Sequence, residues 1–391
     1  MSIYQHYLET AGNLIDKYDN CIPFHLYLKQ FFSLHKKYGS RDRKHISAFC
    51  FSFFRFGHAF TGIPINEKLL LTYYLISSES SPMLQVLNPE YNKSVALPIT
   101  EKIKIAGVQF SYKDIFPFYD LLSNKLTGDD YTISMLHQPD LFLRIRPKME
   151  TVVTNKMKQL EWNFSVEENG AVRLPNSLNI EKEFQINREI VIQDLNSQQV
   201  GIVISNCFKL NHFLPTQVWD CCAASGGKSI MLYDLFPGIK ITVSDIRPSI
   251  IRNLEKRFDE AGIKAASKFV ADLSGKVPRS VIKHIDFIIA DVPCSGSGTW
   301  SRTPEQLYYF KEESARSYAA RQKSIANNLI GFLKPGGWLV YITCSVFKCE
   351  NEEVVTFLQE TGKLKLVHQE LLDGTKIKAD SMFVAILKRE K

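Results

Sequence analysis

Two cysteines and one aspartate stand where their side chains could take part in a reaction. Cys294 lies in the segment Asp291-Val292-Pro293-Cys294, and Cys344 lies in Thr343-Cys344-Ser345. Each segment follows an apolar run typical of a buried strand, so both thiols are expected at turns after strands rather than on apolar faces. We therefore interpret both cysteines as reactive thiols. Five others are interpreted as small buried hydrophobic side chains: Cys21, Cys50, Cys207, Cys221 and Cys349.

A glycine turn and three further aspartates fit a nucleoside-type pocket. The apolar segment that ends at Asp220 leads into AASGGK, where Gly226 and Gly227 would let the backbone approach a ligand beside a helix N-terminus. Asp245 ends the next strand, 25 residues after Asp220, and is suited to hold a ribose diol. Asp272 follows the third strand. Ligands of open α/β sheets bind at such strand ends, so the pattern predicts a binding site there.

The glycine turn does not match the common phosphate-binding patterns. It is not GxGxxG, and GxxxxGK[ST] would need glycine where Cys222 or Ala223 stands. A tight connection between a strand and a helix is the alternative interpretation of the glycines alone. The aspartates at the strand ends favour the binding site over that alternative.

Two thiols and a carboxylate beside such a pocket fit methylation of carbon 5 of a pyrimidine. Carbon 5 is a poor nucleophile, but a thiolate that adds to carbon 6 produces an enamine whose carbon 5 can attack an electrophilic methyl group. An acid near ring nitrogen 3 would neutralise the charge that develops there, and Asp291 is the candidate. One cysteine could be the nucleophile, and the other could assist elimination.

The elements that must position these side chains lie in residues 215–391. Strands alternate with helices there, which predicts a mostly parallel, doubly wound α/β sheet. In such a sheet the strands that precede the two thiols would be neighbours about 5 Å apart. The strands are expected at 217–222, 240–244, 267–271, 284–290, 338–343, 364–369 and 382–388, and helices at 229–236, 248–262, around 318–332 and from about 351.

Two further regions precede this sheet. Residues 127–214 predict a small α+β module, with a strand at 141–147 and a helix at 152–160. Residues 1–126 predict a largely helical region, because apolar side chains recur at helical spacing over 24–35 and 46–54. Ser, Pro and Asn clusters in 77–110 predict an irregular loop with short strands.

Composition agrees with a globular enzyme of two or three domains. The chain has 391 residues, 45% of them hydrophobic and 23% charged. The longest apolar runs fall well short of the roughly 18 residues that span a bilayer, and the first residues lack a secretory pattern. The eight cysteines are sparse and none forms a CxxC pair, so we expect no metal ion and reduced thiols in the cytoplasm. We expect a monomer.

The formal net charge of +7 is concentrated in one window. Residues 29–55 hold seven basic side chains and one acid, a net +6. A patch that binds RNA phosphates and a solvated loop are equally open interpretations of this window. The candidate phosphate contacts are Lys36, Lys37, Arg41, Arg43 and Lys44, together with Arg144 and Arg146 on the strand of the α+β module.

The C-terminal half resembles the RNA (cytosine-5) methyltransferases of the Sun, or RsmB-like, family. DCCAASGGKS is similar to the cofactor loop of that family, with Ser225 where a proline is usual. DVPCSGSGTWSRTPE looks like its proline-cysteine motif, with the tail Arg302, Pro304 and Glu305. ITCSVFKCENEEVV looks like its threonine-cysteine-serine motif, and VIQDLNSQQVG resembles the segment before the cofactor domain. Upstream, LRIRPKME resembles the start of a small RNA-contacting module, and residues 38–57 resemble part of a NusB-like helical domain.

This resemblance implies a Rossmann-like class I methyltransferase domain, S-adenosylmethionine as cofactor and RNA as substrate. It implies Cys344 as the nucleophile, Cys294 as the thiol that aids product release, Asp291 at the ring edge and Arg302 as an RNA contact. The implied cofactor contacts are Cys222, Ala223, Ala224, Ser225, Gly226, Gly227, Lys228, Asp245, Asp272 and Asp291. Ribosomal RNA is the expected substrate and transfer RNA the rival.

Two other functions stay open at this point. One is a DNA cytosine-5 methyltransferase that uses Cys294; the motif at Cys344 and the lack of an evident large recognition segment after it speak against this interpretation. The other is a non-catalytic RNA-binding protein with the same fold, and the intact thiols and Asp291 speak against that interpretation.

Overall fold

The computed structural model describes residues 2–275 and 285–390, which form two compact units. The first unit comprises Met1–Leu122, Leu126–Gln138 and Thr299–Lys311. The second comprises Ser123–Lys125, Pro139–Gly298 and Glu312–Lys391. His284, where the fourth strand of the sheet was expected to begin, lies outside the described residues. The three-part division at residues 126 and 214 stays a prediction.

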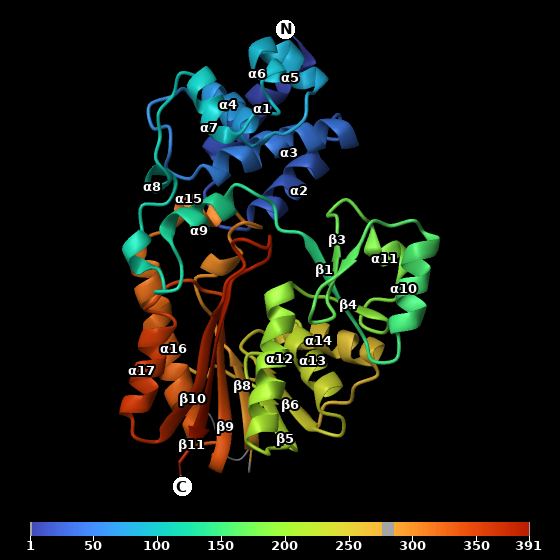
Figure 1. The fold of residues 1–391 in the computed structure, drawn as a ribbon, viewed down its shortest axis with the longest axis vertical. Helices are drawn as coiled ribbons and strands as arrows, with labels where there is room; N and C mark the ends of the chain where they lie inside the picture. The colour runs from blue at the N-terminus through green and yellow to red at the C-terminus, as the bar shows by residue number, and fades with distance from the viewer. Residues whose placement is uncertain (1, 276–284, 391) are drawn as a thin grey trace. The chain divides into compact units, whose positions relative to one another are not determined.

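The first unit is helical (Figure 1). Its α-helices are α1 (Ile3–Lys17), α2 (Phe24–Leu34), α3 (Ser40–Arg55), α4 (Ile65–Ile76), α5 (Pro82–Leu87), α6 (Pro89–Lys93), α7 (Ile99–Ile105), α8 (Tyr112–Ile115), α9 (Gly128–Met135) and α15 (Glu305–Tyr309). Phe24, Phe49 and Phe54 are fully buried in its core, as the helical spacing predicted. Pro23 gives α2 no side-chain cap, and the Glu305 carboxylate accepts a hydrogen bond from the Phe24 N–H at 3.2 Å instead.

The prediction of an irregular loop with short strands over residues 77–110 is wrong. Three short helices, α5, α6 and α7, occupy most of this segment. The Ser81 hydroxyl accepts a hydrogen bond from the Leu84 N–H, and Pro82 starts α5. The Asn88 side chain caps α6 in the same way. The Ser, Pro and Asn clusters that suggested loops are therefore helix starts, where these residues are equally favoured.

A seven-stranded sheet forms the centre of the second unit, and the predicted doubly wound α/β fold is confirmed. The strands are β5 (Gln217–Asp220), β6 (Lys240–Asp245), β7 (Ser267–Val270), β8 (Ile285–Asp291), β9 (Leu333–Thr343), β10 (Leu364–Leu372) and β11 (Met382–Arg389). Their order is β10-β11-β9-β8-β5-β6-β7. β5 to β9 run parallel, whereas β11 is antiparallel to both β9 and β10. The order reverses between β5 and β8, which is where ligands bind in such sheets.

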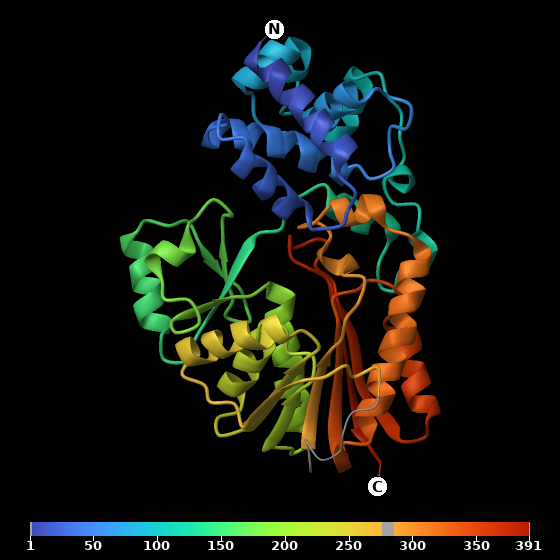
Figure 2. The ribbon, with the colours of Figure 1, turned by 180° about the vertical axis from the view of Figure 1, so that it is seen from behind.

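Helices cover both faces of this sheet (Figures 1 and 2). On one face lie α12 (Leu195–Leu210), α13 (Gly227–Leu235) and α14 (Pro248–Ala261), and on the other lie α16 (Glu312–Ile330) and α17 (Glu352–Glu360). The central parallel strands β5, β6, β8 and β9 are buried over most of their length, whereas the edge strands β7 and β10 carry exposed residues. Trp219 and Trp338 are among the largest buried side chains. Strands buried on both faces are typical of parallel sheets.

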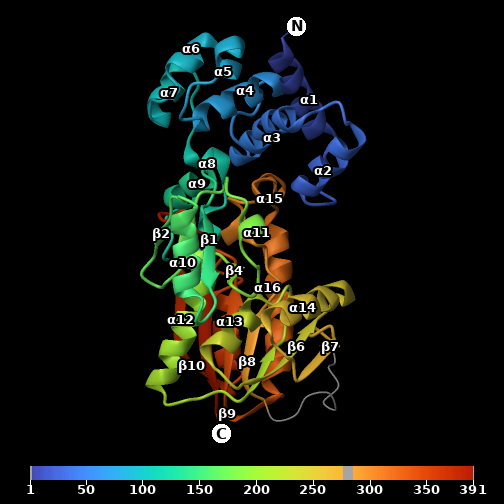
Figure 3. The ribbon, with the colours of Figure 1, turned by 90° about the vertical axis from the view of Figure 1, so that its right-hand side faces the viewer.

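The predicted α+β module is present within the second unit. Its sheet has the order β2-β3-β1-β4, with β1 (Leu141–Ile145), β2 (Ser165–Val166), β3 (Val172–Leu174) and β4 (Ile190–Ile192). Its helices are α10 (Glu150–Gln159), which lies beside the strands in Figure 3, and α11 (Ile180–Glu183). Leu143, Val153 and Met157 form part of its own apolar core.

Across residues 2–275 and 285–390, no helix is both long enough and apolar enough to cross a membrane.

Candidate active site

The two thiols singled out in the sequence lie next to each other. Cys294 follows β8 and Cys344 follows β9, and these strands pair in parallel with Asp291 opposite Ile342. The two sulfur atoms are 3.3 Å apart, and both cysteines are free. Parallel neighbours end at the same edge of a sheet, which is why residues 50 positions apart meet here.

A buried polar network holds the two thiol loops together. The Ser295 N–H and hydroxyl donate to the Glu350 carboxylate at 3.0 Å and 2.9 Å, and the Gly298 N–H donates to the Cys344 carbonyl at 2.8 Å. Gly298 leaves no room for a side chain, since a Cβ there would lie 2.0 Å from the Ser381 carbonyl oxygen. Contacts between the two thiol loops thus help to fix both of them.

Glu350 was not singled out from the sequence, although it is fully buried. Burial raises the pKa of its carboxyl, and hydrogen bonds from Ser345 and Ser295 oppose that rise. Nothing in the local pattern around Glu350 distinguishes it from Glu352 and Glu353, which are less buried, because Ser295 lies in the other loop.

The environment of Cys294 keeps its thiol protonated. The hydrogen bond with the Cys344 thiol, burial and the charges of Cys344 and Glu350 all raise the pKa of Cys294 well above its ordinary value. A protonated thiol can hold or donate a proton, whereas a nucleophile must be a thiolate. This environment suits Cys294 to holding a proton.

Asp291 forms an ion pair with Lys228 beside the thiols. The Lys228 ammonium lies 2.7 Å from the Asp291 carboxylate, and the two side chains are 11% and 29% exposed. Burial alone would lower the pKa of Lys228, but the charge and the hydrogen bond of Asp291 outweigh it, so the pKa is raised. Lys228 comes from the glycine turn that begins α13, and the ion pair therefore links that turn to β8.

A cavity of about 440 Å³ brings together seven of the twelve predicted catalytic and cofactor residues, whereas Ala223, Ser225, Gly226, Gly227 and Lys228 do not line it. That volume lies within the range of small-molecule sites. The sequence placed Tyr318 and Ile325 on an apolar helix face and overlooked Arg321, but all three line this cavity from α16. Its other lining residues are Cys221, Cys222, Ala224, Asp245, Ile246, Arg247, Ala271, Asp272, Leu273, Asp291, Val292, Pro293, Cys294 and Cys344.

The glycine turn has a strained backbone and an open side. Ala224 has φ +44° and Gly226 has φ +84°, both in the left-handed region. The Ala224 N–H donates to Asp245 at 3.1 Å, and the Gly226 N–H donates to the Ala223 carbonyl at 2.8 Å. A Cβ on Gly227 would meet nothing within 4 Å. The turn thus leaves space at a helix N-terminus for a close ligand.

The two acidic side chains that follow β6 and β7 differ in environment. Asp245 is 6% exposed and also accepts hydrogen bonds from Arg247, whose N–H lies 2.9 Å away. Asp272 is exposed, and hydrogen bonds from Ser274 lower its pKa. Both border the cavity, so both remain candidates for a cofactor contact.

Arg144 and Arg146, predicted as RNA contacts, point into the second unit instead. They pair with Asp234 at 2.5 Å and 2.9 Å and are only 13% and 10% exposed. Both guanidinium groups are nearly buried and share one carboxylate, and we do not retain them as phosphate contacts. Alternation along β1 predicted the strand correctly but could not reveal Asp234, which is 90 residues away from Arg144.

The other predicted RNA contacts lie in the first unit. Arg302 is half-buried there. The remaining five are exposed at the end of the α2–α3 connection and the start of α3: Lys36, Lys37, Arg41, Arg43 and Lys44. Their exposure is compatible with contacts to phosphates, and this role stays a prediction.

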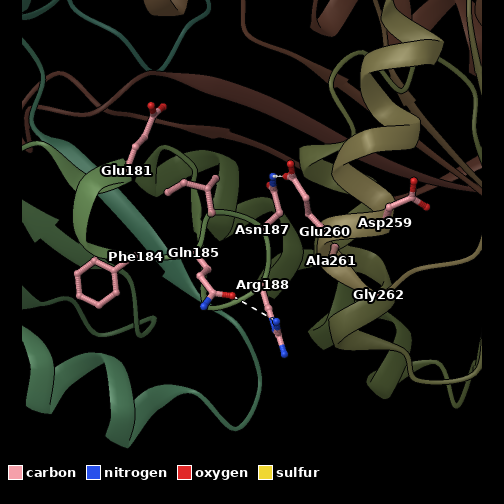
Figure 4. A pocket seen from close by; sticks show the side chains of 10 residues that line it. Glu181, Phe184, Gln185, Asn187, Arg188, Asp259, Glu260, Ala261 and Gly262 are labelled. Carbon is pink, nitrogen blue, oxygen red and sulfur yellow. Dashed lines mark hydrogen bonds between the residues drawn. The ribbon is translucent and has the colours of Figure 1, made fainter.

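A larger hollow of about 900 Å³ lies elsewhere in the second unit (Figure 4). It is bordered by α11, the segment before β4 and the end of α14. Its lining is Glu181, Phe184, Gln185, Ile186, Asn187, Arg188, Asp259, Glu260, Ala261 and Gly262. It contains no nucleophile, and size alone does not make it the reactive site.

The buried carboxyl group of Asp220 should make the stability of the chain depend on pH. Its side chain is buried at the end of β5, where burial raises its pKa to about 7 against the hydrogen bond from Ser229. Between the ordinary value of 3.8 and about 7 the folded state binds more protons than the unfolded state, so the free energy of unfolding falls as pH rises. Asp220→Asn is expected to remove most of this fall, on the order of 3 kcal/mol. Urea unfolding at several pH values measures it.

Asp272→Asn is the matched control for that measurement. Asp272 is an exposed carboxylate whose pKa is lowered, so its contribution has the opposite sign and is retained above its ordinary pKa. An Asp220→Asn chain whose stability still fell between pH 4 and pH 7 as in the unaltered chain would contradict the prediction.

The comparison with protein families matches residues 209–389 to 16S rRNA methyltransferase RsmB/F. Ribosomal RNA small subunit methyltransferase B of Xylella fastidiosa is 32% identical over 174 residues, which cover 44% of this chain and 40% of that protein. Ribosomal RNA small subunit methyltransferase F of Salmonella heidelberg is 33% identical over 153 residues, covering 39% and 31%. The chain thus matches two fifths or less of these relatives. The resemblance predicted from the sequence is confirmed for this part.

Solved structures share the fold at low sequence identity. The crystal structure of a protein named PH0851 has a TM-score of 0.69 and 18% identity, with 100% of both chains covered. A methyltransferase homologue from Pyrococcus horikoshii has a TM-score of 0.57 and 17% identity, covering 74% of this chain and 98% of its own. The predicted Rossmann-like methyltransferase fold is confirmed.

Proposed function

We propose, from the match of residues 209–389 to the RsmB/F methyltransferases, that this chain is an S-adenosylmethionine-dependent RNA (cytosine-5) methyltransferase. One observation carries the proposal: two free thiols 3.3 Å apart share a cavity with an ion-paired aspartate and with Cys222 and Ala224 of the turn that leads to Gly227. A thiol pair beside a nucleoside-sized cavity suits addition to, and release from, a pyrimidine ring.

The residues around the cavity fit S-adenosylmethionine, which supplies an electrophilic methyl group when bound. Space beside Gly227 would receive the ligand at a helix N-terminus, and Asp245 and Asp272 would face hydroxyl or amino groups. The proposed contacts are Cys222, Ala223, Ala224, Ser225, Gly226, Gly227, Lys228, Asp245, Asp272 and Asp291.

In this proposal Cys344, which the resemblance to the threonine-cysteine-serine motif of the family assigns as the nucleophile, adds to carbon 6 of the cytosine, and the raised pKa of Cys294 suits that thiol to holding a proton. Asp291 lies near ring nitrogen 3, where its carboxyl group would hold a proton against the negative charge that develops there, and the contact with Lys228 fixes that group in place. After methylation a base takes the proton from carbon 5, the electrons of that bond restore the double bond between carbons 5 and 6, and Cys344 leaves as a thiolate with the assistance of Cys294. The cytosine must be unstacked to reach the cavity.

The proposed substrate is small-subunit ribosomal RNA, with transfer RNA as the rival. The likeness to the rRNA methyltransferases supports the first. Exposed basic side chains at the α2–α3 connection would add sequence-independent contacts to phosphates. A cytoplasmic, monomeric enzyme stays a prediction.

The experiment that tests this function is transfer of labelled methyl groups from S-adenosylmethionine to RNA and DNA of matched sequence. We expect 5-methylcytosine in RNA alone, and bisulfite sequencing of cellular RNA with and without the gene would identify the position. Methylation of DNA in preference to RNA would favour the DNA enzyme. RNA binding without binding of S-adenosylmethionine would favour the non-catalytic protein.

The two glycines of the turn are expected to respond differently to alanine. Gly227→Ala adds a Cβ to open space at the start of α13, so the chain should fold normally but bind S-adenosylmethionine at least tenfold more weakly, about 1.4 kcal/mol. Gly226→Ala forces φ +84° on alanine and brings its Cβ within 3.3 Å of Phe258 and Leu254, so it should lose about 1–2 kcal/mol of stability. Calorimetric titration and thermal unfolding measure the two effects. Normal binding by Gly227→Ala would place the ligand elsewhere.

A further inference from the structure

The glycine turn is braced from α14 by one arginine. Arg257 donates through Nη1 to the carbonyl oxygen and to the hydroxyl of Ser225, at 2.8 Å each. Ser225 stands between Ala224 and Gly226, which both have positive φ. A left-handed alanine costs roughly 1–2 kcal/mol, so this conformation needs support from outside the turn.

The same guanidinium is held from its other side by the α+β module. Nε and Nη2 of Arg257 donate to the Asn187 side-chain oxygen at 3.0 Å and 2.7 Å. Asn187 lies just before β4 and is 3% exposed. Its amide nitrogen donates to Glu260 at 2.7 Å, a contact drawn in Figure 4, and its carbonyl accepts from Arg146. Asn187 is therefore a fixed anchor.

Only arginine suits this place between two acceptors. The planar guanidinium presents five N–H donors in a rigid fork and can bind Asn187 and Ser225 at once, whereas one ammonium group cannot span both. Ser225 itself is exposed, so its bond with Arg257 adds little to global stability. The hydrogen bond between Arg257 and Ser225 instead stabilises the conformation of the turn.

We propose that Arg257 is a positioning residue for the cofactor turn: Asn187 holds its guanidinium, and the guanidinium keeps Ala224–Gly226 in the conformation that leaves Gly227 open. The nature of the ligand rests on the proposed function, but the bracing of the turn does not. The α+β module thereby helps to set the affinity of a site that it does not line.

The test compares Arg257→Gln with Arg252→Gln in the full chain. Arg252 is an exposed arginine on the same helix, so its loss removes the same charge. Hydrogen–deuterium exchange of the ligand-free chains should be faster over residues 222–228 in Arg257→Gln alone. Equal exchange in the two variants would overturn the proposal. Asn187→Ala should accelerate the same segment, although less.

Calorimetric titration with S-adenosylhomocysteine separates this proposal from the proposed function. Arg257→Gln should bind about tenfold more weakly than Arg252→Gln, and Arg257→Lys should restore little of the loss. In methylation assays the KM for S-adenosylmethionine should rise while kcat at saturation stays unchanged. If the unaltered chain failed to bind, the proposed function would be wrong, and the exchange comparison would still decide the role of Arg257.

Discussion

Cys344→Ala is expected to lower methyl transfer to RNA by about 10⁴-fold or more and to eliminate covalent protein–RNA adducts. Loss of a nucleophile removes the covalent path itself, which is among the largest single effects known in enzymes. The expectation follows from the resemblance of Thr343-Cys344-Ser345 to the family motif that carries the nucleophile, and the raised pKa of Cys294 fits the other role. Transfer of labelled methyl groups and denaturing gels of protein–RNA mixtures measure the two outcomes.

Two other cysteine variants serve as comparisons in this experiment. Cys294→Ala should still add to the cytosine but release it slowly, so adducts should accumulate. Cys349→Ala removes a thiol five residues from Cys344 whose pKa burial raises to about 11, and it should leave methyl transfer unchanged. Full activity of Cys344→Ala together with loss of adducts in Cys294→Ala would exchange the two roles.

The meeting of the thiols could be predicted because it depends on topology alone. Cys294 and Cys344 each end a strand of a parallel sheet, and alternation of strands and helices is visible in the sequence. The side-chain contacts that hold the site could not be predicted in this way. Glu350 meets Ser295 across 55 residues, and Arg257 meets Asn187 across 70, without any local pattern that announces either contact.

Two predictions from the sequence failed for the same physical reason. The Ser, Pro and Asn clusters of residues 77–110 favour turns and helix starts alike, and packing in the helical unit decides between them. Arg144 and Arg146 lie on the predicted strand, but they point inward because of partners elsewhere in the chain, among them Asp234 on α13. Local spacing predicts a helix or strand and which of its faces is apolar. The side chain that contacts a given face comes from elsewhere in the chain, and local spacing does not reveal it.

Asp291→Asn is expected to remove methyl transfer by a further route, with a loss of about 10²–10³-fold. The substitution keeps the shape of the side chain but takes away the carboxyl group proposed to hold a proton near ring nitrogen 3. It also leaves the Lys228 ammonium, 11% exposed, without its counterion. Stability should fall by about 2 kcal/mol, less than for a wholly buried pair because Asp291 is 29% exposed.

Asp291→Asn should change how the stability of the chain depends on pH, through its effect on Lys228. In the unaltered chain the pKa of Lys228 is raised, so its contribution to stability is complete at neutral pH and is lost only as pH rises through the folded-state value. Without Asp291, burial is the dominant influence left on Lys228 and its pKa should drop below the ordinary value. Asp291→Asn should therefore become more stable as pH rises above neutrality, whereas the unaltered chain should not.

The double variant Lys228→Met with Asp291→Asn separates structure from chemistry. Removing both charges leaves no unpaired ion, so stability should recover most of its loss. Methyl transfer should not recover, because the carboxylate is still missing. Glu312→Gln breaks an exposed ion pair with Arg316 on α16 and should change neither quantity. A double variant with the activity of the unaltered chain would mean that Lys228 and Asp291 serve only to hold the turn against β8, and the proposed contact of Asp291 with the cytosine ring would be wrong.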